Sequence, residues 1–290
     1  MFQVIKKIIQ YPRVTQNYPA KPFDTSLISG KPVIGPEKCT ACGACIARCP
    51  SGAIVENPET HKAEIHYDAC IFCVLCSEVC PHGAVEITDE FELAVKLRKQ
   101  LHANGSLEEQ AIPPCDDVTF EESGMPRCDT TNDENHGMAS CGEPTYEELG
   151  KQLKEKIEKR FGRSLQIREV DSGSCNGCDY EINALNNPFN DIERFGIHFV
   201  ASPRHADMLL VTGTAARNME LALLKTYEAT PSPKLVGAVG ACACSGGIFR
   251  DSYAVKNGID SVVPVDVYIP GCPPRPQAIL YGILKAIDRL

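Results

Sequence analysis

Two twelve-residue stretches decide the organisation of this chain: CTACGACIARCP at residues 39–50 and CIFCVLCSEVCP at residues 70–81. Each reads C-x2-C-x2-C-x3-C-P, and the second begins 31 residues after the first. This spacing is typical of proteins with two [4Fe–4S] clusters, in which the fourth cysteine of each copy binds the other cluster. The repeat therefore predicts a protein that transfers electrons one at a time.

The spacing has a chemical reason, because thiolates are soft ligands that suit iron–sulfur clusters or zinc. Two residues between successive cysteines let three sulfurs converge on one face of a cluster, and the fourth must come from elsewhere. The predicted ligands of cluster I are Cys39, Cys42, Cys45 and Cys80, and those of cluster II are Cys70, Cys73, Cys76 and Cys49. The alternative is a pair of zinc sites, but these use paired C-x2-C knuckles rather than three ligands in a row followed by C-P.

The composition fits a reduced, intracellular protein of about two domains. The chain has 290 residues and 16 cysteines, which is long for a disulfide scaffold. Residues 1–9 are amphipathic and lack a small-residue cleavage site, so we expect no signal peptide. No apolar run reaches the roughly 18 residues of a membrane helix, so we expect contact with a membrane only through partner subunits.

An acidic segment divides the chain. Residues 101–150 contain twelve acidic side chains and one basic side chain, with several prolines and glycines, which is typical of a linker or wrapping arm. Cys115, Cys128 and Cys141 lie in this segment, and they are either free thiols or, with His136, ligands of a further metal. The chain has no basic stripe, so we expect no nucleic-acid partner.

The remaining residues alternate between predicted strands and helices. Strands are expected at 165–170, 197–201, 208–212, 235–239 and 265–269, and helices at 150–161, 215–227 and 274–290. This alternation predicts a largely parallel sheet covered on both faces. The predicted domains are therefore a two-cluster domain at 1–100, the acidic linker or arm at 101–149, and an α/β domain at 150–290.

Four more cysteines follow the predicted strands. Cys175 and Cys178 come after 165–170, Cys242 after 235–239, and Cys272 after 265–269. Open α/β sheets bind their ligands at the carboxyl ends of the strands, so we expect these four thiols to meet at one edge of the sheet. The alternative is that they are buried apolar cysteines.

Several motifs of the chain resemble those of a known family. The motifs SCNGCD (174–179), SPRHAD (202–207), GAC (240–242) with SGGIF (245–249), and PVDVYIPGCPP (264–274) resemble the small subunits of membrane-bound, energy-converting [NiFe] hydrogenases of the formate hydrogenlyase type. That family includes the 20 kDa iron–sulfur subunit of respiratory complex I. Residues 1–100, with MF (1–2), IKK (5–7) and FELAV (91–95), resemble the ferredoxin-like subunit of formate hydrogenlyase. The chain thus resembles a fusion of two subunits.

The resemblance implies a fold, cofactors and ligands. The fold would be an α+β ferredoxin-like domain followed by an α/β flavodoxin-like domain. Together with the repeat, the resemblance implies three [4Fe–4S] clusters, and the ligands of the third, proximal cluster would be Cys175, Cys178, Cys242 and Cys272. Cys244 stands close enough to Cys242 to compete, although the family motif selects Cys242. The extra cysteine pairs that end the family's ferredoxin-like subunit are not matched by Cys115, Cys128 and Cys141.

The resemblance also implies a role as the electron-transfer subunit of a membrane-associated [NiFe] hydrogenase. The Ni–Fe site would belong to a separate large subunit, so this chain would have no catalytic metal site of its own. Other partners would be membrane subunits and an electron donor such as formate dehydrogenase, CO dehydrogenase or ferredoxin. The location would be cytoplasmic, on the inner face of the cell membrane. Arg204, Asp179 and Glu181 are expected on the partner-facing rim, with Glu181 as a candidate proton relay or a solvated charge.

Three alternative functions remain open. They are an electron-transfer subunit of a complex I-like quinone oxidoreductase, a soluble polyferredoxin that serves a formate or CO dehydrogenase, and a structural bridge whose clusters only hold the fold. Complex I has adjacent cysteines where this chain has Cys175-x-x-Cys178, which favours a hydrogenase. The cysteines at the strand ends argue against a purely structural bridge.

Overall fold

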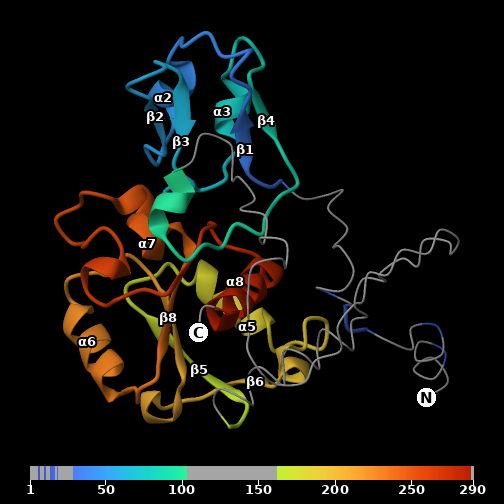
Figure 1. The fold of residues 1–290 in the computed structure, drawn as a ribbon, viewed down its shortest axis with the longest axis vertical. Helices are drawn as coiled ribbons and strands as arrows, with labels where there is room; N and C mark the ends of the chain where they lie inside the picture. The colour runs from blue at the N-terminus through green and yellow to red at the C-terminus, as the bar shows by residue number, and fades with distance from the viewer. Residues whose placement is uncertain are drawn as a thin grey trace, which may run out of the picture.

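A computed structural model describes residues 29–102 and 162–288, together with residues 6, 10, 14–16 and 18. We call residues 29–102 the N-terminal module and residues 162–288 the C-terminal module. In Figure 1 the N-terminal module, coloured blue to green, stands above the C-terminal module, coloured yellow to red. The predicted helix at 150–161 and the three cysteines of the acidic segment lie outside the described residues.

The N-terminal module is a structural repeat that follows the sequence repeat. Each cysteine run contains a short helix, and each C-P is followed by a short strand, β2 after the first run and β4 after the second. Two antiparallel ribbons, β1–β4 and β2–β3, complete the module. The bounds are β1 Pro32–Ile34, α2 Ala44–Arg48, β2 Ile54–Glu56, β3 Ala63–Ile65, α3 Leu75–Glu78, β4 Val85–Ile87 and the 3-10 helix η1 Arg98–His102.

The C-terminal module is built on a five-stranded sheet in which all pairs are parallel, in the order β6-β5-β7-β8-β9. The strands are β5 Leu165–Asp171, β6 Ile197–Phe199, β7 Met208–Thr212, β8 Leu235–Val239 and β9 Val267–Ile269. The helices are α5 Gly177–Ala184, α6 Glu220–Ala229, α7 Gly240–Ser245 and α8 Pro276–Asp288, with 3-10 turns η2 Ile192–Phe195, η3 Pro203–His205, η4 Gly247–Phe249 and η5 Ile259–Ser261. The prediction of a parallel sheet is confirmed.

Both faces of this sheet are buried, because successive residues of a strand point to opposite sides. On β7, Met208 and Leu210 join a core that contains residues of α5 and α8, whereas Leu209 and Val211 join a second core that contains residues of α6 and α7. All five residues of β7 and of β8 are buried. Continuous apolar strands of this kind are the signature of a parallel sheet covered on both sides.

The predicted strands are all present, but the helix predicted at 215–227 is wrong in its first five residues. Helix α6 begins at Glu220, because Ala215 has a left-handed φ of 51° and Ala216 pairs with Val255 in a short antiparallel bridge. The final helix begins at Pro276, two residues later than predicted, with its proline at the first position, where the missing N–H costs nothing.

The two modules share one core and one hydrogen-bonded contact. The core that contains α6 and α7 also contains Ile65, Tyr67 and Leu101 of the N-terminal module. Val95 pairs antiparallel with Tyr268, through N–H···O bonds of 2.9 and 2.8 Å, and so extends the edge of the sheet at β9. The modules are therefore joined by packed chain rather than only by the acidic segment.

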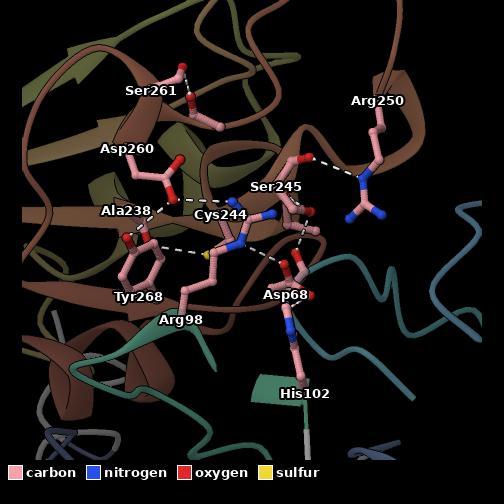
Figure 2. A network of polar contacts seen from close by, with 12 residues as sticks. Asp68, Arg98, His102, Ala238, Cys244, Ser245, Arg250, Asp260, Ser261 and Tyr268 are labelled. Atoms are coloured by element: carbon pink, nitrogen blue, oxygen red, sulfur yellow. Dashed lines mark hydrogen bonds and ion pairs between the residues drawn. The ribbon is translucent and has the colours of Figure 1, made fainter. Parts of the chain in front are cut away.

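A partly buried polar network reinforces this contact (Figure 2). Arg98 lies between two carboxylates, and its Nε donates to Asp68 Oδ2 at 2.8 Å while its Nη1 donates to Asp260 Oδ2 at 3.1 Å. The Asp68 side chain is 1% exposed, so its charge needs this partner. Arg98 thereby connects a loop of the N-terminal module to the turn η5 of the C-terminal module.

Candidate iron–sulfur sites

The first cysteine site is a pocket lined by Cys39, Cys42, Cys45 and Cys80. Three of these come from the first run, and Cys80 is the last cysteine of the second run. The pocket is otherwise lined mainly by small and apolar residues, among them Ala44, Ile46, Ala84 and Val85. The structure therefore brings together the four residues predicted for cluster I.

The second cysteine site is a pocket lined by Cys49, Cys70, Cys73 and Cys76. Here three cysteines come from the second run, and Cys49 ends the first. The arrangement is crossed, because the last cysteine of each run, which precedes the proline, lines the pocket of the other run. These are the four residues predicted for cluster II.

The two runs share an unusual backbone. Ala41 and Gly43 in the first run, and Phe72 and Val74 in the second, all have positive φ between 56° and 70°. Three of these are not glycine, and a non-glycine residue at positive φ is uncommon and costly. The loops therefore adopt an energetically unfavourable backbone conformation, which winds the chain around each pocket.

Backbone N–H groups point at the sulfurs. The Phe72 N–H donates to Cys70 Sγ at 3.4 Å and the Ala84 N–H donates to Cys80 Sγ at 3.2 Å. The bond from Ala84 lowers the pKa of the Cys80 thiol. Hydrogen bonds to cluster sulfurs are one of the ways in which a protein sets a cluster's potential.

Two thiols of the second cysteine site have raised pKa values, in contrast to Cys80 of the first site. Burial raises the pKa of Cys70 to about 12 and that of Cys76 to about 11, and neighbouring cysteines add to both shifts. Several such groups cannot ionise together in a dry pocket unless a cation neutralises them. The donor set therefore fits a bound metal centre.

The third cysteine site lies at the carboxyl edge of the parallel sheet. Cys175 and Cys178 follow β5, Cys242 follows β8 on α7, and Cys272 follows β9. Burial raises the pKa of the Cys178 thiol, and the charges of Cys242, Cys272, Asp179 and Cys175 raise it further, in that order. The pKa of Cys242 rises to about 11 through burial first and then through Cys272 and Cys175. Four thiols from three strand ends therefore act on one another at one place.

Gly240 makes this convergence sterically feasible. It has φ +90°, and a Cβ on it would stand 2.5 Å from Cys178 Sγ. Only glycine adopts this backbone without strain and leaves room for the sulfur. Gly240 is the first residue of the helix that carries Cys242. Its lack of a side chain therefore leaves room for the sulfur of Cys178.

Cys244 is separated from this site. It is fully buried, belongs to the core that contains α6 and α7, and lies within hydrogen-bond range of the Ala238 carbonyl at 3.7 Å. Cys242 instead is half-buried beside Cys272 and Cys175. The geometry therefore favours Cys242 over Cys244 as a member of the third site.

The second and third cysteine sites are neighbours. The charge of Cys73 contributes to the raised pKa of Cys272, after burial and Cys175. A shared pocket is lined by Ile71 and Phe72 from the second run and by Gly271, Cys272 and Pro273 from the loop after β9. The first cysteine site has no member in that pocket, so the three sites follow one another in the order first, second, third.

The three charged residues expected on the partner-facing rim differ in their surroundings. Asp179 faces inward, where its carboxylate accepts hydrogen bonds from Ser174 Oγ at 2.6 Å and Thr212 Oγ1 at 2.9 Å. Arg204 is exposed. Glu181 is half-buried, and burial raises its pKa while Arg275 lowers it.

Sequence reasoning missed a carboxyl pair beside the third site. The Glu169 side chain is hydrogen-bonded to Asp179, and its pKa is raised to about 7 by burial first and by Asp179 second. Glu169 lies two residues after Ile167, on the strand face that belongs to the core. An acidic residue at such a core-facing position is the signal that could have found it.

Together, a two-cluster ferredoxin-type module and a parallel α/β module with four converging thiols define an iron–sulfur oxidoreductase subunit. Residues 31–81 match the 4Fe-4S dicluster domain, and residues 175–286 match the family described as NADH ubiquinone oxidoreductase, 20 Kd subunit. The chain belongs to this 20 kDa family, since it covers 79% of a relative to which it is 52% identical.

Three curated relatives illustrate the family. Formate hydrogenlyase subunit 7 of Escherichia coli (strain K12) is 49% identical over 146 residues, 50% of this chain and 57% of the relative. The probable membrane-bound hydrogenase subunit mbhJ of Pyrococcus furiosus is 52% identical over 133 residues, 46% of this chain and 79% of the relative. An NADH-quinone oxidoreductase subunit of Geobacter metallireducens is 53% identical over 113 residues, 39% of this chain and 66% of the relative.

The chain thus spans little more than half the length of the formate hydrogenlyase relative. Among solved structures, a chain of the membrane-bound sulfane sulfur reductase, an archaeal respiratory membrane complex, is 39% identical, with 46% of this chain and 73% of that chain covered and a TM-score of 0.41. In the described part of this protein, no helix has the length and apolar character that crossing a membrane requires.

Proposed function

We propose that this chain is the electron-transfer subunit of a membrane-associated [NiFe] hydrogenase of the formate hydrogenlyase type. The observation that carries the proposal is the adjacency of the second and third cysteine sites through Cys73 and Cys272. Three sites in sequence form a path that crosses from one module to the other. A chain whose clusters only held the fold would not need this order.

The ligand assignment is part of the proposal. The first site would hold one [4Fe–4S] cluster through Cys39, Cys42, Cys45 and Cys80, the second would hold one through Cys49, Cys70, Cys73 and Cys76, and the third would hold one through Cys175, Cys178, Cys242 and Cys272. The crossed pockets support the first two sets, and the mutual effects of the thiols support the third. When bound, such clusters accept and release single electrons.

The domain boundaries are also proposed, at residues 1–100 and 150–290, with the acidic arm at 101–149 between them. The strand order β6-β5-β7-β8-β9 supports a flavodoxin-like fold for the C-terminal domain, because it has the 2-1-3-4-5 arrangement of that fold. Arg98, Val95 and the shared core keep the domains together, so the distance between the second and third sites is set by packing.

The chain's own residues support electron transfer in three ways. The thiols hold the metal centres, the N–H groups of Phe72 and Ala84 stabilise negative sulfur, and small apolar residues limit the access of water. Proton reduction requires electrons at a reduction potential of roughly −410 mV at pH 7, because this potential falls by about 59 mV per pH unit for one electron. Cysteine-ligated clusters span about −700 to +450 mV, so the donor set is suited to this couple.

The partners follow from the same proposal. The four cysteines outside the three sites contain no C-x-x-C pair, so the nickel site would belong to a separate large subunit that contacts the third cysteine site. Membrane subunits would hold the complex on the inner face of the cell membrane. The electron donor would be a formate dehydrogenase, a CO dehydrogenase or a ferredoxin, and would contact the N-terminal module.

The test is anaerobic purification of the full chain from its source with its native partners. We expect a nickel-containing large subunit to co-purify, and we expect the complex to evolve hydrogen from a low-potential electron donor. Co-purification with nickel-free subunits that reduce a quinone would contradict the proposal and favour a complex I-like oxidoreductase. A chain that purifies alone with reducible clusters would favour a soluble polyferredoxin.

A further inference from the structure

A second group of metal-ligating side chains lies outside the three cysteine sites. His66, Asp68 and His102 place one ligand atom each within 4.8 Å of one another. His66 directly follows β3, Asp68 lies two residues before Cys70, and His102 is the last residue of η1. The loop after β3 and the end of η1 therefore meet at this cluster, which we call the His–Asp–His cluster.

Two atoms of the cluster are buried and lack regular hydrogen bonds. Asp68 Oδ1 and His102 Nε2 lie 3.2 Å apart, yet neither has a hydrogen bond of good geometry among the described residues. Leaving buried polar atoms in this condition costs about 1–3 kcal/mol each. Buried polar atoms without a hydrogen bond in a well-packed structure indicate that a water or an ion binds there.

The two imidazole rings of the cluster lie against each other. The rings of His66 and His102 are stacked, with centroids 4.3 Å apart and an interplanar angle of 7°. Burial lowers the pKa of His66, and the charge of His102 lowers it further. Neutral imidazole is the form that binds metals.

We propose that His66, Asp68 and His102 bind one divalent transition-metal ion, with zinc as the probe. Two imidazole nitrogens and one carboxylate oxygen form a three-ligand set, and a fourth position would be left for water. Asp68 Oδ1 would supply the oxygen and the two rings the nitrogens. One ring would turn out of the stack, because an imidazole nitrogen binds a metal in the plane of its ring. This metal would be distinct from any iron held by cysteines, because no cysteine belongs to the cluster.

Arg98 is consistent with this role. It binds Asp68 Oδ2 at 2.8 Å and leaves Oδ1 available (Figure 2). Carboxylates that bind metals are commonly held by a hydrogen bond to their second oxygen. The positive charges of Arg98 and Arg250 oppose a cation here, so we expect weaker binding than at a site without them.

The metal would brace the part of the N-terminal module that contacts the C-terminal module. η1 is joined to the C-terminal module through the bond between Arg98 and Asp260, and Asp68 precedes the loop of the second cysteine site. An ion on His102 and Asp68 would therefore fix that loop against η1. Since a ligand that binds only the folded state stabilises it by mass action, zinc should raise the thermal midpoint of the full chain.

The experiment uses the full, cluster-loaded chain prepared without oxygen and dialysed against zinc. We expect one zinc per chain beyond the iron, and an X-ray absorption spectrum at the zinc edge with nitrogen and oxygen ligands at about 2.0–2.1 Å, imidazole scattering, and no sulfur at about 2.3 Å. Sulfur coordination would mean that the zinc is held by cysteines, either those of an iron–sulfur site or those of the acidic segment, and would overturn the proposal. Absence of bound zinc would overturn it as well.

Variants locate the ion. His66→Gln and His102→Gln should each weaken zinc binding more than about 100-fold, because loss of an outer-shell partner alone typically costs about 10–100-fold. His205→Gln changes an exposed histidine of the C-terminal module and should bind zinc as the parent does. Equal zinc affinity in the parent and in His102→Gln would rule the site out. The iron content of each variant reports whether it has folded. If a variant has not folded, the X-ray absorption spectrum of zinc bound to the parent decides whether the site exists.

Discussion

Ser245 Oγ donates a hydrogen bond of 2.8 Å to the backbone carbonyl of Asp68. Ser245 lies three residues after Cys242, and Asp68 lies two residues before Cys70, so this bond joins the helix of the third cysteine site to the loop of the second. Ser245 is fully buried. The spacing between two successive sites is thus held by a buried contact, which is what an electron path between modules requires.

The two neighbouring cysteines on α7 provide a matched pair of variants. Cys242→Ser should remove the third cluster and lower the iron content from about twelve to about eight atoms per chain, since each cluster holds four. Cys244→Ser should keep all of the iron, because Cys244 lies in the core away from the other thiols. Iron analysis and EPR of the reduced proteins measure both. Loss of iron in Cys244→Ser together with full iron in Cys242→Ser would show that Cys244, and not Cys242, belongs to the third cysteine site.

Gly240 should tolerate no side chain. In Gly240→Ala the new Cβ would stand 2.5 Å from Cys178 Sγ, so the iron content should fall by about a third while the first two sites keep theirs. Gly162→Ala is the control, because Gly162 also has positive φ, +65°, but has nothing within 4 Å of the added atom. Full iron in Gly240→Ala would show that the third site does not need this close approach.

Arg98 should matter to stability more than its partly exposed position suggests. Arg98→Met leaves the Asp68 carboxylate, 1% exposed, without its guanidinium partner, which should cost about 3 kcal/mol and lower the thermal midpoint by roughly 6–12 °C. Lys99→Met changes an exposed basic residue of the same 3-10 helix and should have little effect. Equal midpoints for the two variants would show that the network of Figure 2 adds nothing to stability.

Glu169 should make stability depend on pH. Its pKa is about 7 in the folded chain, against an ordinary 4.5, because burial and then Asp179 favour the protonated form. The resulting stabilisation is complete below about pH 4.5 and is lost as the pH rises through 7. The thermal midpoint of the parent should therefore fall between about pH 5.5 and 8, and Glu169→Gln should flatten this fall. Glu228→Gln, at an exposed position, should leave it as it is in the parent.

The order of the elements could be predicted because the sequence patterns are local. The strands at 208–212 and 235–239 are short apolar runs with charged or turn residues on either side, and both are present with the predicted bounds. The start of α6 could not be predicted, since it depends on the bridge between Ala216 and Val255, residues that are distant in sequence. Leu221 fits the helical pattern but is 62% exposed, which periodicity alone does not reveal.

The cysteines could be predicted because their spacing is itself the signal, both within the repeat and after successive strands. The contacts that place the sites relative to one another could not. Val95 with Tyr268, and Arg98 with Asp260, each join segments that lie more than 160 residues apart. The His–Asp–His cluster is hidden for the same reason, since His102 comes from a short 3-10 helix with no motif. Pairings of this kind depend on how the modules pack, which no local pattern contains.

The most direct measurement is EPR of the anaerobically purified full chain, reduced in steps, together with its iron content. The account predicts about twelve iron atoms per chain and three distinct, low-potential [4Fe–4S] signals, the third of which is missing in Cys242→Ser. A chain that holds only zinc on its cysteines and shows no reducible chromophore would contradict it.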